Sequence, residues 1–145
     1  MRSCSIGQKS NLISVLFLAI IFTAVSCAKK MTFLNSSVVP AARGTVQVKR
    51  DNNHNYVIKL QLSDLAEVSR LQPAKQMYVV WMVTEQQQTK NIGQIKSSTG
   101  RLSKRLKASF ETVSSFKPEK ILISAEDQAD VQYPGSMVVL STSSF

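Results

Sequence analysis

The stretch GTVQVKRDNNHNYVIKLQL, residues 44–62, decides the fold, because two alternating runs flank a cluster of polar residues. In residues 45–49 both valines fall on one face, and in residues 56–62 every second side chain is aromatic or aliphatic. A period of two indicates β-strands. Residues 51–55 between them are typical of a turn, because Asp and Asn side chains hydrogen-bond the nearby backbone. The stretch therefore predicts a β-hairpin.

Further segments continue the β pattern. Residues 77–83, MYVVWMV, are continuously apolar, which predicts a central strand that is covered on both faces. Trp81 in this run is interpreted as a buried core residue rather than one that stacks on a ligand. A further buried strand is expected at residues 120–125 and a last strand at residues 137–141, with a weak strand at residues 91–96 and a short one at residues 37–39.

Two segments are open to more than one interpretation. Residues 63–71 allow one or two helical turns, because Leu65, Val68 and Leu71 are three residues apart and Pro73 ends the run. Residues 102–113 suit either a helix or a strand. Taken together, about seven short strands separated by turn signals predict an all-β protein with a single immunoglobulin-like β-sandwich.

The amino-terminal segment predicts export. Residues 12–25 carry no charge and follow Arg2 and Lys9, which is the pattern of a secretory signal peptide. The run is shorter than the ~20 residues that a spanning helix needs; a short membrane anchor or a buried helix is the alternative. Residues 24–27, AVSC, resemble the lipobox of bacterial lipoproteins. That resemblance implies cleavage before Cys27, a diacylglycerol on its thiol, and acylation of the new amino terminus, for example with palmitate.

These features predict three parts of the chain. Residues 1–26 are a lipoprotein signal peptide, residues 27–43 a lipidated tether, and residues 44–145 a β-sandwich domain. The membrane is then a partner through the lipid anchor on Cys27. The resemblance of residues 28–30, AKK, to lipoprotein sorting signals implies the outer membrane, with the domain facing the periplasm.

The mature chain offers little chemistry beyond binding. Cys4 leaves with the signal peptide and Cys27 is lipidated, so no disulfide is expected. A single histidine, His54, excludes a His-rich metal site and leaves a serine triad without an evident base and acid. The acidic residues 126–130 do not have the spacing of a calcium loop. We therefore expect no cofactor, no metal and no catalysis.

Basic charge is the strongest compositional signal. The net charge is +9, and removing the two basic residues of the signal peptide leaves +7. The densest basic cluster comprises Arg101, Lys104, Arg105 and Lys107, which are a candidate docking patch for phosphates of an anionic envelope polymer. The alternative is a charged edge that discourages aggregation between strands. Nucleic acid is not an expected partner at an exported address.

The order of the carboxyl-terminal segments resembles the extracytoplasmic domain of anti-sigma-K factors. The residues that carry the resemblance are Tyr78–Val83 (YVVWMV), 91–95 (NIGQI), 121–125 and 134–141 (PGSMVVLS), with the hairpin of residues 44–62 before them. The resemblance implies a sandwich that faces signals outside the cytoplasm. The zinc-binding part and membrane span of those regulators have no counterpart here, so no direct contact with a sigma factor is expected.

The function expected from the sequence is thus a membrane-anchored lipoprotein with a non-catalytic binding or sensor-like domain that docks an envelope protein. The alternative is a basic lipoprotein that binds an envelope polymer or has a purely structural role. In both cases the protein belongs to the cell envelope.

Overall fold

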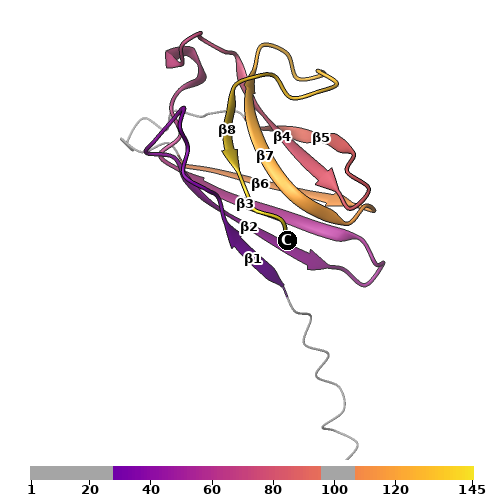
Figure 1. The fold of residues 1–145 in the computed structure, drawn as a ribbon. Coiled ribbons are helices and arrows are strands. Elements are labelled where there is room, and N and C mark those ends of the chain that lie inside the picture. The colour runs from indigo at the N-terminus through magenta and orange to yellow at the C-terminus, as the bar shows by residue number, and fades with distance from the viewer. Residues whose placement is uncertain (1–27, 96–106) are drawn as a thin grey trace, which may run out of the picture.

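The hairpin predicted from residues 44–62 is present and forms the middle of the first of two antiparallel sheets (Figure 1). The computed structural model describes residues 28–95 and 107–145. The first sheet has the order β1-β2-β3-β6, with β1 (Lys29–Thr32), β2 (Arg43–Arg50), β3 (Tyr56–Ser63) and β6 (Lys107–Ser114). The second has the order β5-β4-β7-β8, with β5 (Thr89–Ile95), β4 (Met77–Thr84), β7 (Pro118–Glu126) and β8 (Val138–Ser141).

The strands are divided between the two sheets in the same way as in an immunoglobulin-like sandwich. In chain order, β2, β3 and β6 take the places of strands A, B and E, whereas β4, β5, β7 and β8 take those of C, C′, F and G. β1 adds a further edge strand beside β2. The prediction of an all-β sandwich is confirmed, with eight strands in the described residues instead of about seven.

The turn of the hairpin is held by its own first residue. The carboxylate Oδ1 of Asp51 accepts hydrogen bonds from the backbone N–H groups of Asn53 (2.9 Å) and Asn55 (2.8 Å). His54 adopts a left-handed backbone conformation with φ of 65° and is exposed. This local bonding, expected from the cluster of Asp and Asn residues, brings the two strands into register.

Alternation directs one face of each sheet into a shared core. Val46 lies opposite Leu60 and Val48 opposite Ile58, and all four are buried, as the sequence predicts. The second sheet faces them with the inward rows of β4 and β7, namely Tyr78, Val80, Met82, Ile121, Ile123 and Ala125. These rows form one continuous apolar cluster between the sheets, which supplies the main driving force for folding.

A glycine on β5 lets the two sheets approach closely. Gly93 has φ of +142°, a conformation that is essentially restricted to glycine. It lies opposite Val80, next to an irregularity in the register between β4 and β5. A Cβ atom at this position would stand 2.7 Å from the ring of Phe110 on β6. The absence of a side chain on Gly93 therefore makes room for an aromatic ring of the opposite sheet.

The second sheet is also covered on its outer face. Trp81 and Val79 are fully buried but point away from the cluster between the sheets. The segment after β7, residues 127–137, returns along this side and is fixed to it by Asn91, whose amide Nδ2 donates to the carbonyl oxygen of Ala129 at 2.8 Å. The prediction that residues 77–83 form a central strand with both faces covered is confirmed, because β4 lies between β5 and β7.

The prediction of a tether at residues 27–43 is corrected from Lys29 onward. Residues 29–32 form β1, which pairs with β2, and Phe33, Val39 and Ala42 are buried in the core. The backbone N–H of Leu34 donates to the carbonyl oxygen of Ser141 at 2.8 Å, which links this segment to β8 of the other sheet. Residues 29–43 are therefore part of the sandwich. A chain that begins at Ala28 would contain all eight described strands.

Three smaller predictions also have outcomes. Residues 37–39, expected as a short strand, are bends in the loop between β1 and β2. Residues 63–71 contain a single 3₁₀ turn, Val68–Arg70, rather than an α-helix. For residues 102–113 the strand interpretation is correct from Lys107 onward, and residues 102–106 lie outside the described part of the chain.

Tyr78 connects the core to the segment just before the 3₁₀ turn and gives the fold a predicted sensitivity to alkaline pH. Its hydroxyl donates to the carbonyl oxygen of Ala66 at 2.8 Å, and burial raises the pKa of Tyr78 to about 12. An unfolded tyrosine ionises near 10. The unfolded state therefore loses this proton first, so the free energy of unfolding should fall by about 2 kcal/mol at most between pH 10 and pH 12.

The measurement is urea unfolding at several pH values combined with absorbance of ionised tyrosine. Tyr78→Phe should remove the late-ionising tyrosine signal and flatten that part of the pH dependence. Tyr133→Phe, at an exposed position, is the matched control and should leave both unchanged. An unaltered late signal in Tyr78→Phe would contradict the assignment.

Candidate functional site

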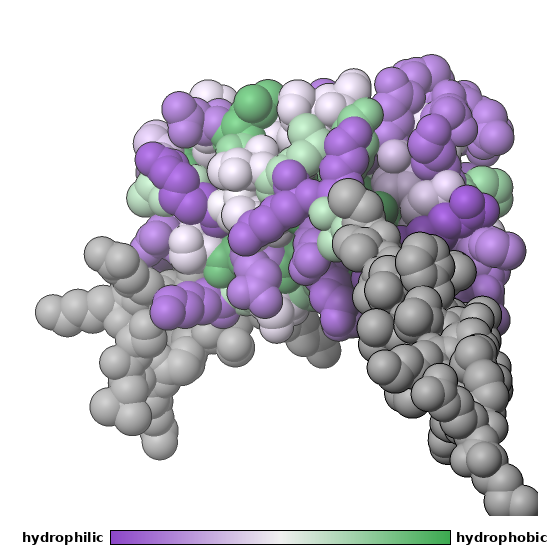
Figure 2. Space-filling view, turned by 90° about the horizontal axis from the view of Figure 1, so that it is seen from below, coloured by the Kyte–Doolittle hydropathy of each residue, from purple (hydrophilic) through white to green (hydrophobic). Residues whose placement is uncertain are grey.

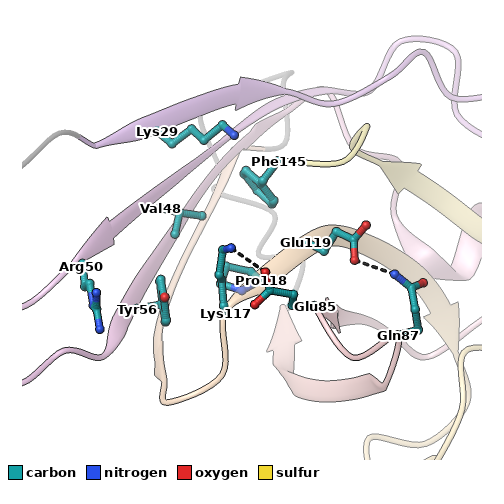
Figure 3. Close-up of a pocket in the computed structure, with 10 residues that line it drawn as sticks. All are labelled: Lys29, Val48, Arg50, Tyr56, Glu85, Gln87, Lys117, Pro118, Glu119 and Phe145. Carbon is teal, nitrogen blue, oxygen red and sulfur yellow. Dashed lines mark hydrogen bonds and ion pairs between the residues drawn. The ribbon is translucent and has the colours of Figure 1, made fainter.

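A pocket of about 570 Å³ opens between the two sheets at the end of the sandwich where β1 and β7 begin (Figure 3). A volume of this size is in the range of small-ligand sites, roughly 300–1,000 Å³. The lining residues come from both sheets and from the segment after β8: Lys29, Val48, Arg50, Tyr56, Glu85, Gln87, Lys117, Pro118, Glu119 and Phe145. The pocket is thus formed by segments that lie far apart in the sequence.

The first sheet contributes the ends of its inward rows. Lys29 lies opposite Val48, and Arg50 lies opposite Tyr56, so all four side chains belong to the face that is apolar further along the strands. At this end the row changes from valine and isoleucine to arginine, lysine and tyrosine. The core therefore passes gradually into a partly polar pocket without any change of strand register.

The second sheet contributes two polar pairs. The Lys117 ammonium lies 2.7 Å from Oε1 of Glu85, and this carboxylate raises the pKa of Lys117 above its ordinary value. The amide Nε2 of Gln87 donates to Oε2 of Glu119 at 2.6 Å. Both carboxylates in the pocket are therefore bonded to a side chain next to them, as the dashed lines in Figure 3 indicate.

The remaining charged groups of the pocket are cationic. The Arg50 guanidinium lies 5.8 Å from the ring centre of Tyr56, and its Nε donates a long hydrogen bond of 3.4 Å to the carbonyl oxygen of His54. Within residues 28–95 and 107–145, neither Lys29 nor Arg50 has a carboxylate partner. Phe145, held by a bond from its N–H to the carbonyl oxygen of Glu119, supplies an apolar surface nearby. The arrangement can hold an anionic group beside an apolar one.

The acidic residues 126–130 do not line this pocket. Glu126 is buried, and its Oε1 accepts hydrogen bonds from Ser124 Oγ and from the N–H of Gly135 at 2.7 Å. Asp127 pairs with Lys75 at 2.7 Å. Glu126 thus holds Gly135 of the segment after β7 against the second sheet, and Asp127 ties the start of that segment to the loop before β4.

The predicted site residues fall in different places. Cys27, Arg101, Lys104 and Arg105 lie outside the described residues. Lys107 is the first residue of β6, is exposed, and lies opposite Ser63. Together with Arg43 it lines a shallow depression on the outer face of the first sheet, away from the pocket between the sheets.

Three further findings complete the description, and the first two concern the described residues alone. No group of three or more His, Cys, Asp or Glu side chains in the described residues is placed to hold a metal ion. No helix in that same part of the chain is long and apolar enough to cross a membrane. No protein-family model, no curated protein and no solved structure matches this chain.

Proposed function

We propose that this protein is a lipoprotein anchored to the cell envelope through Cys27, with a β-sandwich that acts as a non-catalytic binding module. The lipobox-like residues 24–27 carry the proposed anchor. The position of β1, which begins at Lys29, two residues after Cys27, carries the placement of the domain at the membrane. Two residues of chain span at most about 7 Å. Lys29 also lines the pocket between the sheets. A lipid on Cys27 would therefore hold the pocket close to the membrane surface.

The side chains of the pocket support binding rather than catalysis. Glu85 and Glu119 are each bonded to a neighbouring side chain, and His54 lies in the exposed turn outside the pocket lining. A nucleophile activated by a histidine base needs those groups within hydrogen-bond reach of each other. Lys29, Arg50, Tyr56 and Phe145 instead offer cationic and aromatic contacts, which suit a partner or ligand from the envelope.

The experiment is fractionation of cells that express the full chain, with mass spectrometry of the mature amino terminus. Cys27→Ser should abolish the lipid mass and move the protein from the membrane to the soluble fraction, or leave it as uncleaved precursor. One acyl chain alone gives only marginal membrane binding, so loss of a multiply acylated cysteine should change the distribution almost completely.

Cys4→Ser is the matched control, because it removes the other cysteine of the chain and leaves the proposed anchor intact. It should pellet with membranes as the unaltered protein does. Unchanged pelleting of Cys27→Ser, together with a mature terminus that carries no lipid, would contradict the proposal.

A further inference from the structure

The outward face of the first sheet carries a segregated positive charge. The register of β1, β2, β3 and β6 places five exposed cations on it, Lys30, Arg43, Lys49, Lys59 and Lys107, which we call the outer basic face. The only acidic side chain that the same register places there is Glu111. Among the described residues this face therefore has a formal excess of four positive charges.

Most of these charges have no carboxylate partner. Glu111 pairs with Lys59 at 3.1 Å, and both side chains are about half exposed. Lys30, Lys49 and Lys107 have no ion pair within the described chain. Their neighbours on the face are mainly uncharged polar residues such as Gln47 and Gln61. An unpaired cationic sheet face attracts anions and repels another copy of itself.

The outer face of the second sheet is arranged differently. The outer face of the second sheet is covered by residues 127–137, which bring in the carboxylates of Asp127 and Asp130. The first sheet has no such covering segment in the described residues. Seen from below, the side on which the first sheet lies in Figure 1, the described surface is mostly hydrophilic, with small and separated hydrophobic areas (Figure 2).

We infer that the outer basic face docks on the anionic headgroups of a lipid bilayer, so that the sandwich lies on its first sheet. Two observations favour a membrane as the partner of this face: the charge of the headgroups complements it, and the proposed lipid site Cys27 lies close to it in the chain. β1 is the edge strand of this sheet, Lys30 lies on the face itself, and Cys27 precedes β1 by two residues. This orientation rests on the proposed anchor at Cys27, whereas the charge complementarity does not.

The test uses the chain that begins at Ala28, which keeps every described strand and carries no lipid. Its partitioning is measured by co-sedimentation with phosphatidylglycerol–phosphatidylcholine vesicles and with pure phosphatidylcholine vesicles, at low and moderate salt. Lys49→Gln, Lys59→Gln and Lys107→Gln are combined in one variant. Because each cation near an anionic surface changes affinity about fivefold, the triple variant should bind the anionic vesicles on the order of 100-fold more weakly.

The matched control combines Arg70→Gln, Lys90→Gln and Lys120→Gln, which removes the same charge from outside both the outer basic face and the pocket between the sheets. It should bind the anionic vesicles within about tenfold of the unaltered chain. Circular dichroism verifies that both triple variants keep the β-type spectrum. Binding by the unaltered chain should be lost on pure phosphatidylcholine and should fall steeply with salt, because exposed charges are screened.

Three results would overturn the inference. The first is a control variant that loses as much binding as the outer-face variant, which would mean that the contact is not confined to the outer basic face. The second is equal binding to neutral vesicles. The third is binding to soluble polyphosphate without binding to vesicles, which would favour an envelope polymer. Failure of lipidation at Cys27 would remove the proposed anchor and leave these vesicle results as they stand.

Discussion

A chain that begins at Gly44 should fail to fold cooperatively, although it still contains seven of the eight described strands. The deletion removes β1 and takes Phe33, Val39 and Ala42 out of the core. Loss of a buried phenylalanine side chain alone costs about 3–5 kcal/mol. Whole domains have a free energy of unfolding of about 5–15 kcal/mol. The segment thus contributes a large part of the total stability.

Point variants test the same claim without deleting backbone. Phe33→Ala should lower the free energy of unfolding by about 3–5 kcal/mol, because Phe33 is only 6% exposed and packs beside Gly44. Leu34→Ala is the matched control at the next residue, where the side chain is 52% exposed, and should change it by less than about 1 kcal/mol. Both are measured by urea unfolding followed by circular dichroism. Equal effects at the two positions, or normal unfolding of the chain from Gly44, would mean that the segment is a tether.

The structure explains why the sequence indicated the hairpin and missed this segment. In residues 44–62 the alternation and the polar turn are both local, so a window of the sequence contains the whole signal. β1 has four residues and little alternation, and it exists because the edge of β2 offers unpaired backbone groups. That partner is about fifteen residues away in the chain. A short edge strand is therefore defined by its neighbour rather than by its own side chains.

The charged surfaces were also beyond what a local stretch of sequence can predict. Residues 101–107 form the densest basic run in the sequence, yet the outer basic face collects cations from four strands that are separated by long stretches of chain. The hairpin register alone would have placed Lys49 and Lys59 on one face, because Lys49 lies opposite Val57 and Lys59 opposite Gln47. Lys30 and Lys107 join them only through the pairing of β1 and β6, which the sequence did not predict.

The pocket between the sheets was not predictable from any local motif. Its side chains come from strand ends of both sheets and from the segment after β8. The one available signal was Tyr56, which stands at the head of an inward row whose other members are aliphatic. A polar or amphipathic residue at the end of such a row indicates where a core opens to solvent. Without knowledge of how the two sheets pack, however, nothing in the sequence indicated that Lys117 and Glu119 line the same pocket as Tyr56.

The burial of Trp81 was predicted correctly, but it is buried by a different part of the molecule than the core between the sheets. The sequence indicated a buried tryptophan, and Trp81 is fully buried. It nevertheless lies on the outer face of β4, where its indole Nε1 donates to Ser124 Oγ at 2.8 Å. Ser124 in turn donates to Glu126, which also accepts the N–H of Gly135. The indole is thus the first member of a bonded chain that reaches the covering segment of residues 127–137.

Trp81→Ala should therefore have two effects at once. The free energy of unfolding should fall by about 3–5 kcal/mol, because a large side chain leaves a fully buried position. The segment of residues 127–137 should also become more sensitive to protease than the strands, since it loses the surface on which it rests. Both effects are measured by urea unfolding with circular dichroism and by limited proteolysis with mass mapping of the fragments.

Trp81→Phe separates the two contributions of this residue. It keeps most of the apolar bulk and removes the indole donor, so it should cost only about 1–2 kcal/mol, the range of a hydrogen bond lost with modest repacking. Val57→Ala, at a half-buried position on the outer face of the first sheet, is a control for loss of an apolar side chain where no segment among the described residues covers the sheet. If Trp81→Ala destabilises no more than Val57→Ala, the covering segment does not protect the indole. If instead the loss is large but cleavage within residues 127–137 is unchanged, the bonds of Asn91, Glu126 and Asp127 suffice to hold the segment, and the indole contributes stability only through its own burial.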